Sequence, residues 1–143
     1  DLRSLKHIGL DSMCFIYHFA GRREYLPLTE ILFGLVEKGD IQAVSSVISV
    51  IETLVAPEKQ GRQLVAYEYE KSFRTLPNLT VSPIDWPQAK LAAKFRAIYP
   101  GLRTPDAIQI ATGILAGAGG FLTNDKRLKQ VNEIKTLILD DYL

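Results

Sequence analysis

The stretch RTPDAIQIATGILAGAGGFLTND, Arg103 to Asp125, decides the fold. Thr104 and Pro105 predict the start of a helix, with Thr104 as its cap and Pro105 in the first helical position. Small and aliphatic residues then recur at helical spacing and predict a closely packed buried face: Ala107, Ile108, Ala111, Ile114, Leu115 and Ala118. The apolar residues 121–123 predict a short strand. The stretch therefore predicts a helix followed by a buried strand.

Short apolar runs alternate with helical patterns along the rest of the chain. Further strands are predicted over residues 5–10, 41–44, 79–84 and 136–139. Other helices are predicted from Asp11-Ser12 to Gly21, from Pro27 to Gly39, from Ser45-Ser46 to the residue before Pro57, from Gln63 to Leu76, and from Trp86 to Tyr99. This alternation predicts one three-layer α/β/α domain over residues 1–143, with a central, mostly parallel sheet of five strands.

The spacing of aliphatic residues predicts which helix faces are buried. In the second helix the stripe has the i, i+3, i+4, i+7 pattern: Leu28, Ile31, Leu32 and Leu35. In the third helix it consists of Val47, Ile48, Ile51, Leu54 and Val55. Glu52 lies on the flank of that third stripe, so its carboxylate is expected to be partly desolvated.

The composition favours a soluble globular protein. Of 143 residues, 47% are hydrophobic and 23% charged, and the net charge is +1, so a nucleic-acid site would need a local basic cluster. The single cysteine, Cys14, excludes an internal disulfide and a cysteine-built zinc site. The longest apolar run, residues 43–56, is shorter than the roughly 20 residues of a membrane span, and no signal peptide is visible. We therefore expect a cytoplasmic protein with no membrane segment.

Four acids occupy positions that this topology would bring together. Asp11 and Asp125 each come just past a predicted strand, whereas Asp106 begins a helix and Glu52 lies within one. In α/β sheets, sites form beyond the carboxyl ends of the strands. Three of the acids also have ordinary explanations: Asp11 as a helix cap, Asp106 as a partner of the helix dipole, and Asp125 as an Asx turn. It is their joint placement that indicates a site.

Four carboxylates at one place require cations. Two carboxylates about 4 Å apart repel by roughly 4 kcal/mol at an effective dielectric near 20. Oxygen ligands favour Mg²⁺ or Mn²⁺ over zinc. An ion held by a few carboxylates keeps several waters, and one such water can attack a phosphodiester in line. The pattern therefore indicates metal-dependent phosphodiester hydrolysis.

Three segments carry a resemblance to a known family: HIGLDSMCFIY around Asp11, VISVIETLVA around Glu52, and TPDAIQIATGILAGAGGFLTNDKRL from Thr104 to Leu128. In order and spacing they resemble the four acidic positions of the PIN-domain nucleases, most closely the short VapC-type toxins of toxin–antitoxin pairs. The resemblance covers essentially the whole chain. It implies a PIN-like fold, a Mg²⁺- or Mn²⁺-dependent ribonuclease that cleaves RNA, a cognate antitoxin as partner, and a homodimer.

The resemblance also implies a role for each acid. Asp11 and Asp106 would be direct ligands of the first ion. Glu52 would bind that ion directly or through water, and Asp125 would hold a second ion or a water bound to a metal. The four together would form the catalytic cluster.

Further residues would support this cluster. Ser12, Thr123 and Asn124 would orient the carboxylates or the bound waters through their hydroxyl and amide groups. Nearby cations would hold the RNA backbone: Arg22, Arg23, Arg103, Lys126 and Arg127.

Two other functions compete with the nuclease. One is a PIN-like module that has lost turnover and binds RNA or protein; the nuclease is favoured because none of the four acids is replaced. The other is a phosphatase or receiver domain phosphorylated on Asp11. That reading is disfavoured because residue 13 is Met13 rather than a second aspartate. The first strand is also not followed by a glycine-rich phosphate loop, which argues against nucleotide binding of the Rossmann or P-loop kind.

Overall fold

The computed structural model describes residues 2–143. Within these residues the chain forms one five-stranded sheet whose order is β3-β2-β1-β4-β5, and every neighbouring pair of strands is parallel. The strands are β1 (His7–Leu10), β2 (Gln42–Ser46), β3 (Leu79–Ser82), β4 (Gly120–Thr123) and β5 (Thr136–Ile138). The predicted three-layer α/β fold with a parallel five-stranded sheet is confirmed.

The strand order creates a switch point beside the central strand. From β1 the chain adds β2 and β3 on one side, and then returns to place β4 and β5 on the other side. Ile8 of β1 accordingly pairs with Ala43 of β2 and with Gly120 of β4. Because all strands are parallel, their carboxyl ends meet at one edge of the sheet. Sites in open parallel sheets form beyond this edge, at the point where the strand order reverses.

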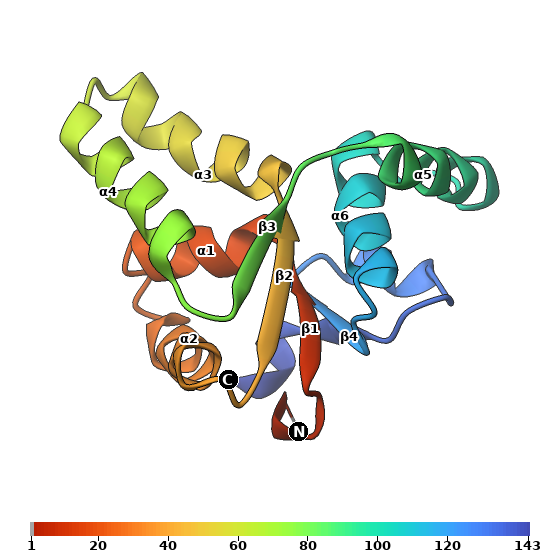
Figure 1. Cartoon of the computed structure of the whole chain (residues 1–143), viewed down its shortest axis with the longest axis horizontal. Coiled ribbons are helices and arrows are strands. Elements are labelled where there is room, and N and C mark those ends of the chain that lie inside the picture. The colour runs from red at the N-terminus through yellow and green to blue at the C-terminus, as the bar shows by residue number, and fades with distance from the viewer. Residues whose placement is uncertain (1) are drawn as a thin grey trace.

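Helices cover both faces of the sheet (Figure 1). Four lie on one face: α1 (Ser12–Phe19), α2 (Leu26–Lys38), α3 (Val47–Lys59) and α4 (Gln63–Thr75). Two lie on the other: α5 (Trp86–Ile98) and α6 (Thr104–Leu115). Short 3-10 helices are η1 (Leu2–Ser4), η2 (Lys126–Gln130) and η3 (Leu139–Tyr142). None of the helices in residues 2–143 combines the length and the apolarity that crossing a membrane requires.

The alternation of side chains along the strands separates two apolar cores. Ile8 and Leu10 of β1, with Leu122 of β4, belong to the core under α1–α4, whereas Phe121 belongs to the core under α5 and α6. Gly9 faces this second core, where a Cβ atom would come within 3.0 Å of Phe121 Cδ1 and 3.5 Å of Gly113 Cα. The absence of a side chain at Gly9 lets α6 pack closely over the centre of the sheet.

The predicted buried face of α3 is wrong. Ile51 and Val55 are 57% and 43% exposed, and the buried side chains are instead Ser49, Thr53 and Pro57. The helix also continues past Pro57 to Lys59. Pro57 has no N–H, so the helix continues there with one ladder hydrogen bond missing.

Two smaller predictions also differ from the structure. In α2 the buried face consists of Thr29, Leu32, Phe33 and Val36, while Ile31 is 56% exposed. The helix α6 begins at Thr104 rather than after it. The cap position is held by Arg103, which makes no side-chain cap hydrogen bond, and the hydroxyl of Thr104 accepts a hydrogen bond of 2.8 Å from Arg96 Nη1.

Candidate active site

Asp11 lies at the carboxyl end of the central strand and is 4% exposed. Its Oδ1 accepts a hydrogen bond of 2.8 Å from the backbone N–H of Ser12, and thereby caps α1 as the sequence predicts. Its Oδ2 accepts a second hydrogen bond, of 2.6 Å, from the hydroxyl of Thr123 at the end of β4. Both carboxylate oxygens are therefore fixed by groups from two neighbouring strand ends.

The surroundings of Asp11 disfavour its negative charge. Burial raises the pKa of its carboxyl from 3.8 to about 6, against the two hydrogen bonds from Thr123 and Ser12, which lower it. The negative charges of Asp106 and Glu52 raise the pKa of Asp11 further. An ionised Asp11 in this position is thus short of positive charge, as expected for a group that binds a cation.

Asp106 is brought to the same edge by the first turn of α6 and is 7% exposed. Its Oδ2 accepts a hydrogen bond of 3.1 Å from Nε of Arg103, the residue that precedes the helix. The positive end of the helix dipole also favours a carboxylate here. Arg103 is largely exposed, so its guanidinium lies at the mouth of the acidic cluster.

Glu52 approaches the cluster from α3 and is an exposed residue, not one bordered by a buried aliphatic stripe as predicted. The expectation was wrong because its neighbours Ile51 and Val55 face the solvent. The hydroxyl of Ser12 donates a hydrogen bond to Glu52 Oε1. Because Ser12 follows Asp11 in sequence, this contact places Glu52 beside Asp11.

Asp125 follows β4 and is held mainly by Arg127. The guanidinium of Arg127 donates to both carboxylate oxygens, at 3.0 Å from Nε to Oδ1 and 2.7 Å from Nη2 to Oδ2. The backbone N–H of Arg127 also donates to Oδ1 at 3.0 Å, which is the Asx-type turn expected from the sequence. These hydrogen bonds from Arg127 lower the pKa of Asp125. Its carboxylate is thus fully engaged within its own loop.

The predicted supporting residues divide into two groups. Ser12 and Thr123 each contact one of the acids: Ser12 donates a hydrogen bond to Glu52, and Thr123 donates one to Asp11. The side chain of Asn124 turns away: its Nδ2 donates to Tyr25 Oη at 3.0 Å and to Asp140 Oδ1 at 3.1 Å, while its Oδ1 accepts from the backbone N–H of Asp140. Asn124 therefore anchors the loop after β4 to η3 instead of contacting the carboxylates.

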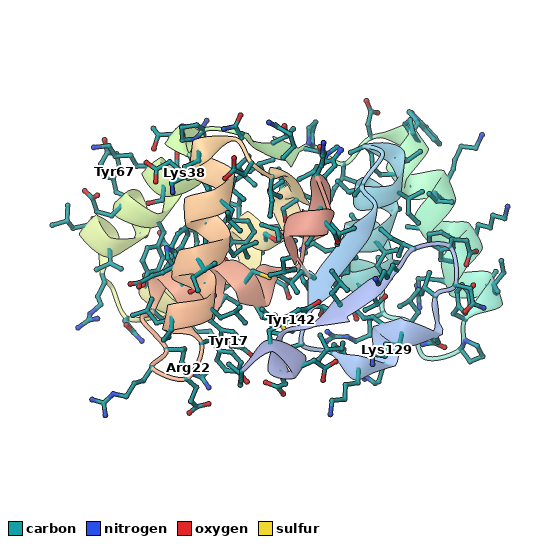
Figure 2. The ribbon with its side chains drawn as sticks, turned by 90° about the horizontal axis from the view of Figure 1, so that it is seen from below. Tyr17, Arg22, Lys38, Tyr67, Lys129 and Tyr142 are labelled. Carbon is teal, nitrogen blue, oxygen red and sulfur yellow. The ribbon has the colours of Figure 1, made fainter. Side chains whose placement is uncertain are left out.

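The side chains predicted to bind RNA differ from one another in their surroundings. Arg103 and Arg127 pair with Asp106 and Asp125. Arg22 lies over the ring of Tyr17, 5.1 Å from its centroid, and the two side chains are seen together in Figure 2. The other two, Arg23 and Lys126, are exposed.

A buried polar network beneath the acids was not predicted. Gln109, on α6 three residues after Asp106, is 2% exposed and contacts Ser12, Ser46 and Ser49. Of the two serines at the predicted start of the third helix, Ser46 is the cap: its hydroxyl accepts from Ile48 N at 3.1 Å. The signal that was missed is a glutamine among the aliphatic residues of a buried helix face.

Comparison with known proteins identifies the family. A profile of the PIN domain matches residues 8–134, which include all four acids. The chain belongs to the PIN domain family. A search of the curated proteins finds no match.

Solved structures share the fold of this PIN domain. A toxin–antitoxin complex from Klebsiella pneumoniae matches with a TM-score of 0.66 and 22% identity, over 93% of this chain and 97% of that one. VapBC2 from Rickettsia felis, bound to a DNA fragment from its promoter, matches with a TM-score of 0.70 and 12% identity, over 92% and 98%. FitAcB from Neisseria gonorrhoeae matches with a TM-score of 0.68 and 16% identity, over 93% and 97%. At these identities the likeness concerns the fold.

The donor set of the PIN domain fits a hard divalent cation. Asp11, Asp106 and Glu52 present oxygen atoms only, and the pKa of Asp11 is raised chiefly by burial and further by the negative charges of Asp106 and Glu52. No three His, Cys, Asp or Glu side chains among residues 2–143 form a ready metal-binding group. A complete protein cage is not needed for Mg²⁺, which is usually bound through one or two carboxylates and keeps several waters.

Proposed function

We propose that this chain is a Mg²⁺- or Mn²⁺-dependent endoribonuclease and the toxin of a toxin–antitoxin pair. The observation that carries the proposal is the buried position of Asp11 and the raised pKa of its carboxyl. Asp11 is a buried carboxyl at the switch point of a parallel sheet, its pKa is raised to about 6, and two further acids contribute to that rise. The ionised form of such a buried carboxyl is unfavourable without a bound cation and is stabilised by one.

The proposed roles follow the contacts of each acid. Asp11 and Asp106 would be ligands of one divalent ion, and Glu52 would bind it directly or through water. When bound, this ion supplies a water of lowered pKa and offsets the negative charge of the phosphodiester. Thr123 keeps Asp11 in one orientation through its 2.6 Å hydrogen bond. Asp125 would take a second ion or a water only after it exchanges its contacts with Arg127.

The arginines at the mouth of the cluster support an RNA substrate. Arg103 and Arg127 are 61% and 66% exposed at the side chain, so each guanidinium has donors free to face a phosphate. Arg22, stacked on Tyr17, adds a cation at the end of α1, with Arg23 beside it in the chain. With Lys126 these residues would contact the backbone of the RNA.

The toxin assignment is supported by the similar structures. The structure from Klebsiella pneumoniae is a toxin–antitoxin complex. This likeness supports a protein antitoxin as partner. The proposal also includes a homodimer, a cytoplasmic location and a single nuclease domain over residues 1–143.

The test is RNA cleavage with Mg²⁺ or Mn²⁺, with and without EDTA, by the wild type and by the Asp11→Asn and Asp106→Asn variants. We expect EDTA and each substitution to abolish cleavage. Asp40→Asn is the matched control, because Asp40 is an exposed acid that precedes β2 at the opposite edge of the sheet. Cleavage that survives EDTA or both substitutions would refute the mechanism. RNA binding without any cleavage would favour the inactive PIN-like binding module.

A further inference from the structure

The buried amide of Gln109 connects three elements that carry the acids. Its Oε1 accepts from the backbone N–H of Ser46 at 3.2 Å and from the Ser46 hydroxyl at 2.6 Å, at the junction of β2 and α3. Its Nε2 lies 2.7 Å from Ser49 Oγ on α3 and 3.1 Å from Ser12 Oγ on α1. Gln109 itself is on α6 with Asp106. All four hydrogen-bonding positions of the amide are used.

The orientation of this amide follows from the backbone. The N–H of Ser46 can only donate, so the atom that faces it has to be the oxygen of Gln109. A flipped amide would place its NH₂ group against that N–H, and both would be left without an acceptor in a buried site. Nε2 must therefore face Ser12 and Ser49, as a donor to both.

This orientation determines where the hydroxyl proton of Ser12 points. Ser12 has one proton, and its oxygen already accepts from Gln109. The proton is therefore directed to Glu52 Oε1, the acceptor that Ser12 Oγ contacts. The Ser49 hydroxyl lies 2.7 Å from that of Ser45, which in turn donates to the carbonyl of Leu10 at 2.8 Å. Each of these hydroxyl protons is thus used once. The Ser12 branch of the network ends at Glu52, and the Ser49 branch ends, through Ser45, at the carbonyl of Leu10.

We propose that Gln109 is a positioning residue that holds the exposed carboxylate of Glu52 beside Asp11 through the hydroxyl of Ser12. The inference rests on the proposed function, since Glu52 is taken as a ligand of the divalent ion. An exposed glutamate otherwise samples several rotamers, and ordering it costs conformational entropy. Loss of a group that orients a metal ligand typically lowers metal affinity or activity by about 10- to 100-fold.

The test is a double-mutant cycle of Gln109→Met and Ser12→Ala. Methionine has a similar length but neither donates to Ser12 nor accepts strongly from Ser46. The matched control is Thr112→Val, one turn further along α6, because Thr112 is buried and its hydroxyl bonds only within the helix, to Ile108 O at 2.8 Å. Urea unfolding of every variant measures the purely structural effect.

We expect Gln109→Met and Ser12→Ala each to lower kcat for RNA cleavage and the affinity for Mn²⁺ by about 10- to 100-fold, with little change in KM. The double variant should lose no more than the more affected single variant, because both act on one pathway. Thr112→Val should lose stability without these changes. An unchanged kcat and Mn²⁺ affinity in Gln109→Met, or fully additive losses in the double variant, would overturn the proposal.

The readouts separate this inference from the proposed function. If the wild type binds Mn²⁺ in calorimetry but cleaves no RNA, the nuclease proposal fails, and the Mn²⁺ affinities still decide the role of Gln109. If the wild type binds no Mn²⁺, crystal structures of the wild type and of Gln109→Met decide whether Gln109 positions Glu52. The Glu52 carboxylate should leave Ser12 in Gln109→Met, and a Glu52 that remains in place would refute the positioning role.

Discussion

The hydroxyl of Thr123 donates to Oδ2 of Asp11 at 2.6 Å, across 112 positions of sequence. The same hydroxyl accepts from the backbone N–H of Asp125 at 3.1 Å. A single side chain thus joins the acid that follows β1 to the backbone of the acid that follows β4. The two halves of the proposed site are connected at this hydroxyl.

Thr123→Val should therefore damage both sides of this connection. Asp11 loses a hydrogen bond that lowers its pKa, so that pKa should rise further. We expect a loss of about 1–3 kcal/mol in the free energy of unfolding, because a buried acceptor is left unsatisfied. RNA cleavage should fall by about 10-fold or more. Thr123→Ser keeps the hydroxyl and should retain most of both properties; equal losses in the two variants would contradict this account.

The metal-free protein should lose stability, relative to Asp11→Asn, as the pH rises. The pKa of Asp11 is raised from 3.8 to about 6, chiefly by burial. The folded protein therefore binds the proton more tightly than the unfolded chain. The resulting stability is fully present below pH 3.8 and is lost as the pH rises through about 6. The difference corresponds to about 3 kcal/mol between these limits.

Urea unfolding in EDTA from pH 4 to pH 8 measures this effect. Across this range the free energy of unfolding of the wild type should fall relative to that of Asp11→Asn. With saturating Mn²⁺ in place of EDTA, the wild type should recover this loss, whereas Asp11→Asn should change little. Parallel pH profiles for the two proteins would show that Asp11 has an ordinary pKa.

Arg127→Ala should weaken RNA binding while leaving the fold intact. The ion pair between Arg127 and Asp125 involves an exposed guanidinium, so its loss should change the free energy of unfolding little. The pKa of Asp125 should rise toward its ordinary value, since hydrogen bonds from Arg127 lower it. If Arg127 contacts a phosphate, the slope of log affinity against log salt concentration should become shallower by about 0.7.

Fluorescence anisotropy with a labelled RNA in EDTA, at several salt concentrations, measures that slope. Arg74→Ala is the matched control, because Arg74 also forms an exposed ion pair, with Glu70 on α4. An equal slope for the two variants would remove Arg127 from the RNA-binding surface.

Two glycine substitutions should change stability in opposite directions. Gly9→Ala would place a Cβ 3.0 Å from Phe121 Cδ1, and we expect a loss of about 1–3 kcal/mol from overpacking. Gly34 lies inside α2, and a Cβ there would meet no atom within 4 Å. Gly34→Ala should gain about 0.4–1 kcal/mol, since alanine restricts the unfolded chain. Thermal or urea unfolding of both variants tests this, and a stabilised Gly9→Ala would show that α6 can move off the sheet.

The order of the elements and the position of the acids could be predicted from local patterns. Asp11 follows the apolar segment of β1 directly, and Asp125 follows that of β4 after one residue, Asn124. In a parallel sheet this is enough to place their backbones at one edge. The family profile covers the same positions.

The partners of the acids could not be predicted in the same way. In α3 the buried residues Ser49 and Thr53 are polar, so a search for an aliphatic stripe selected the opposite face. Ser49 belongs to the network around Gln109, whose members come from four elements, α1, β2, α3 and α6. Nor did the sequence indicate that Asn124 would bond to Tyr25 and Asp140 in preference to the carboxylates. Such contacts depend on how distant segments meet.

The strand order has a consequence for the synthesis of this chain on the ribosome. The central strand β1 is made first, yet its neighbour β4 on one side is made more than a hundred positions later, as the pairing of Ile8 with Gly120 shows. One edge of β1 stays unpaired until then, and Asp11 has no Thr123 to bind. A nascent chain that ends before β4 therefore contains Asp11, Glu52 and Asp106 but no assembled site.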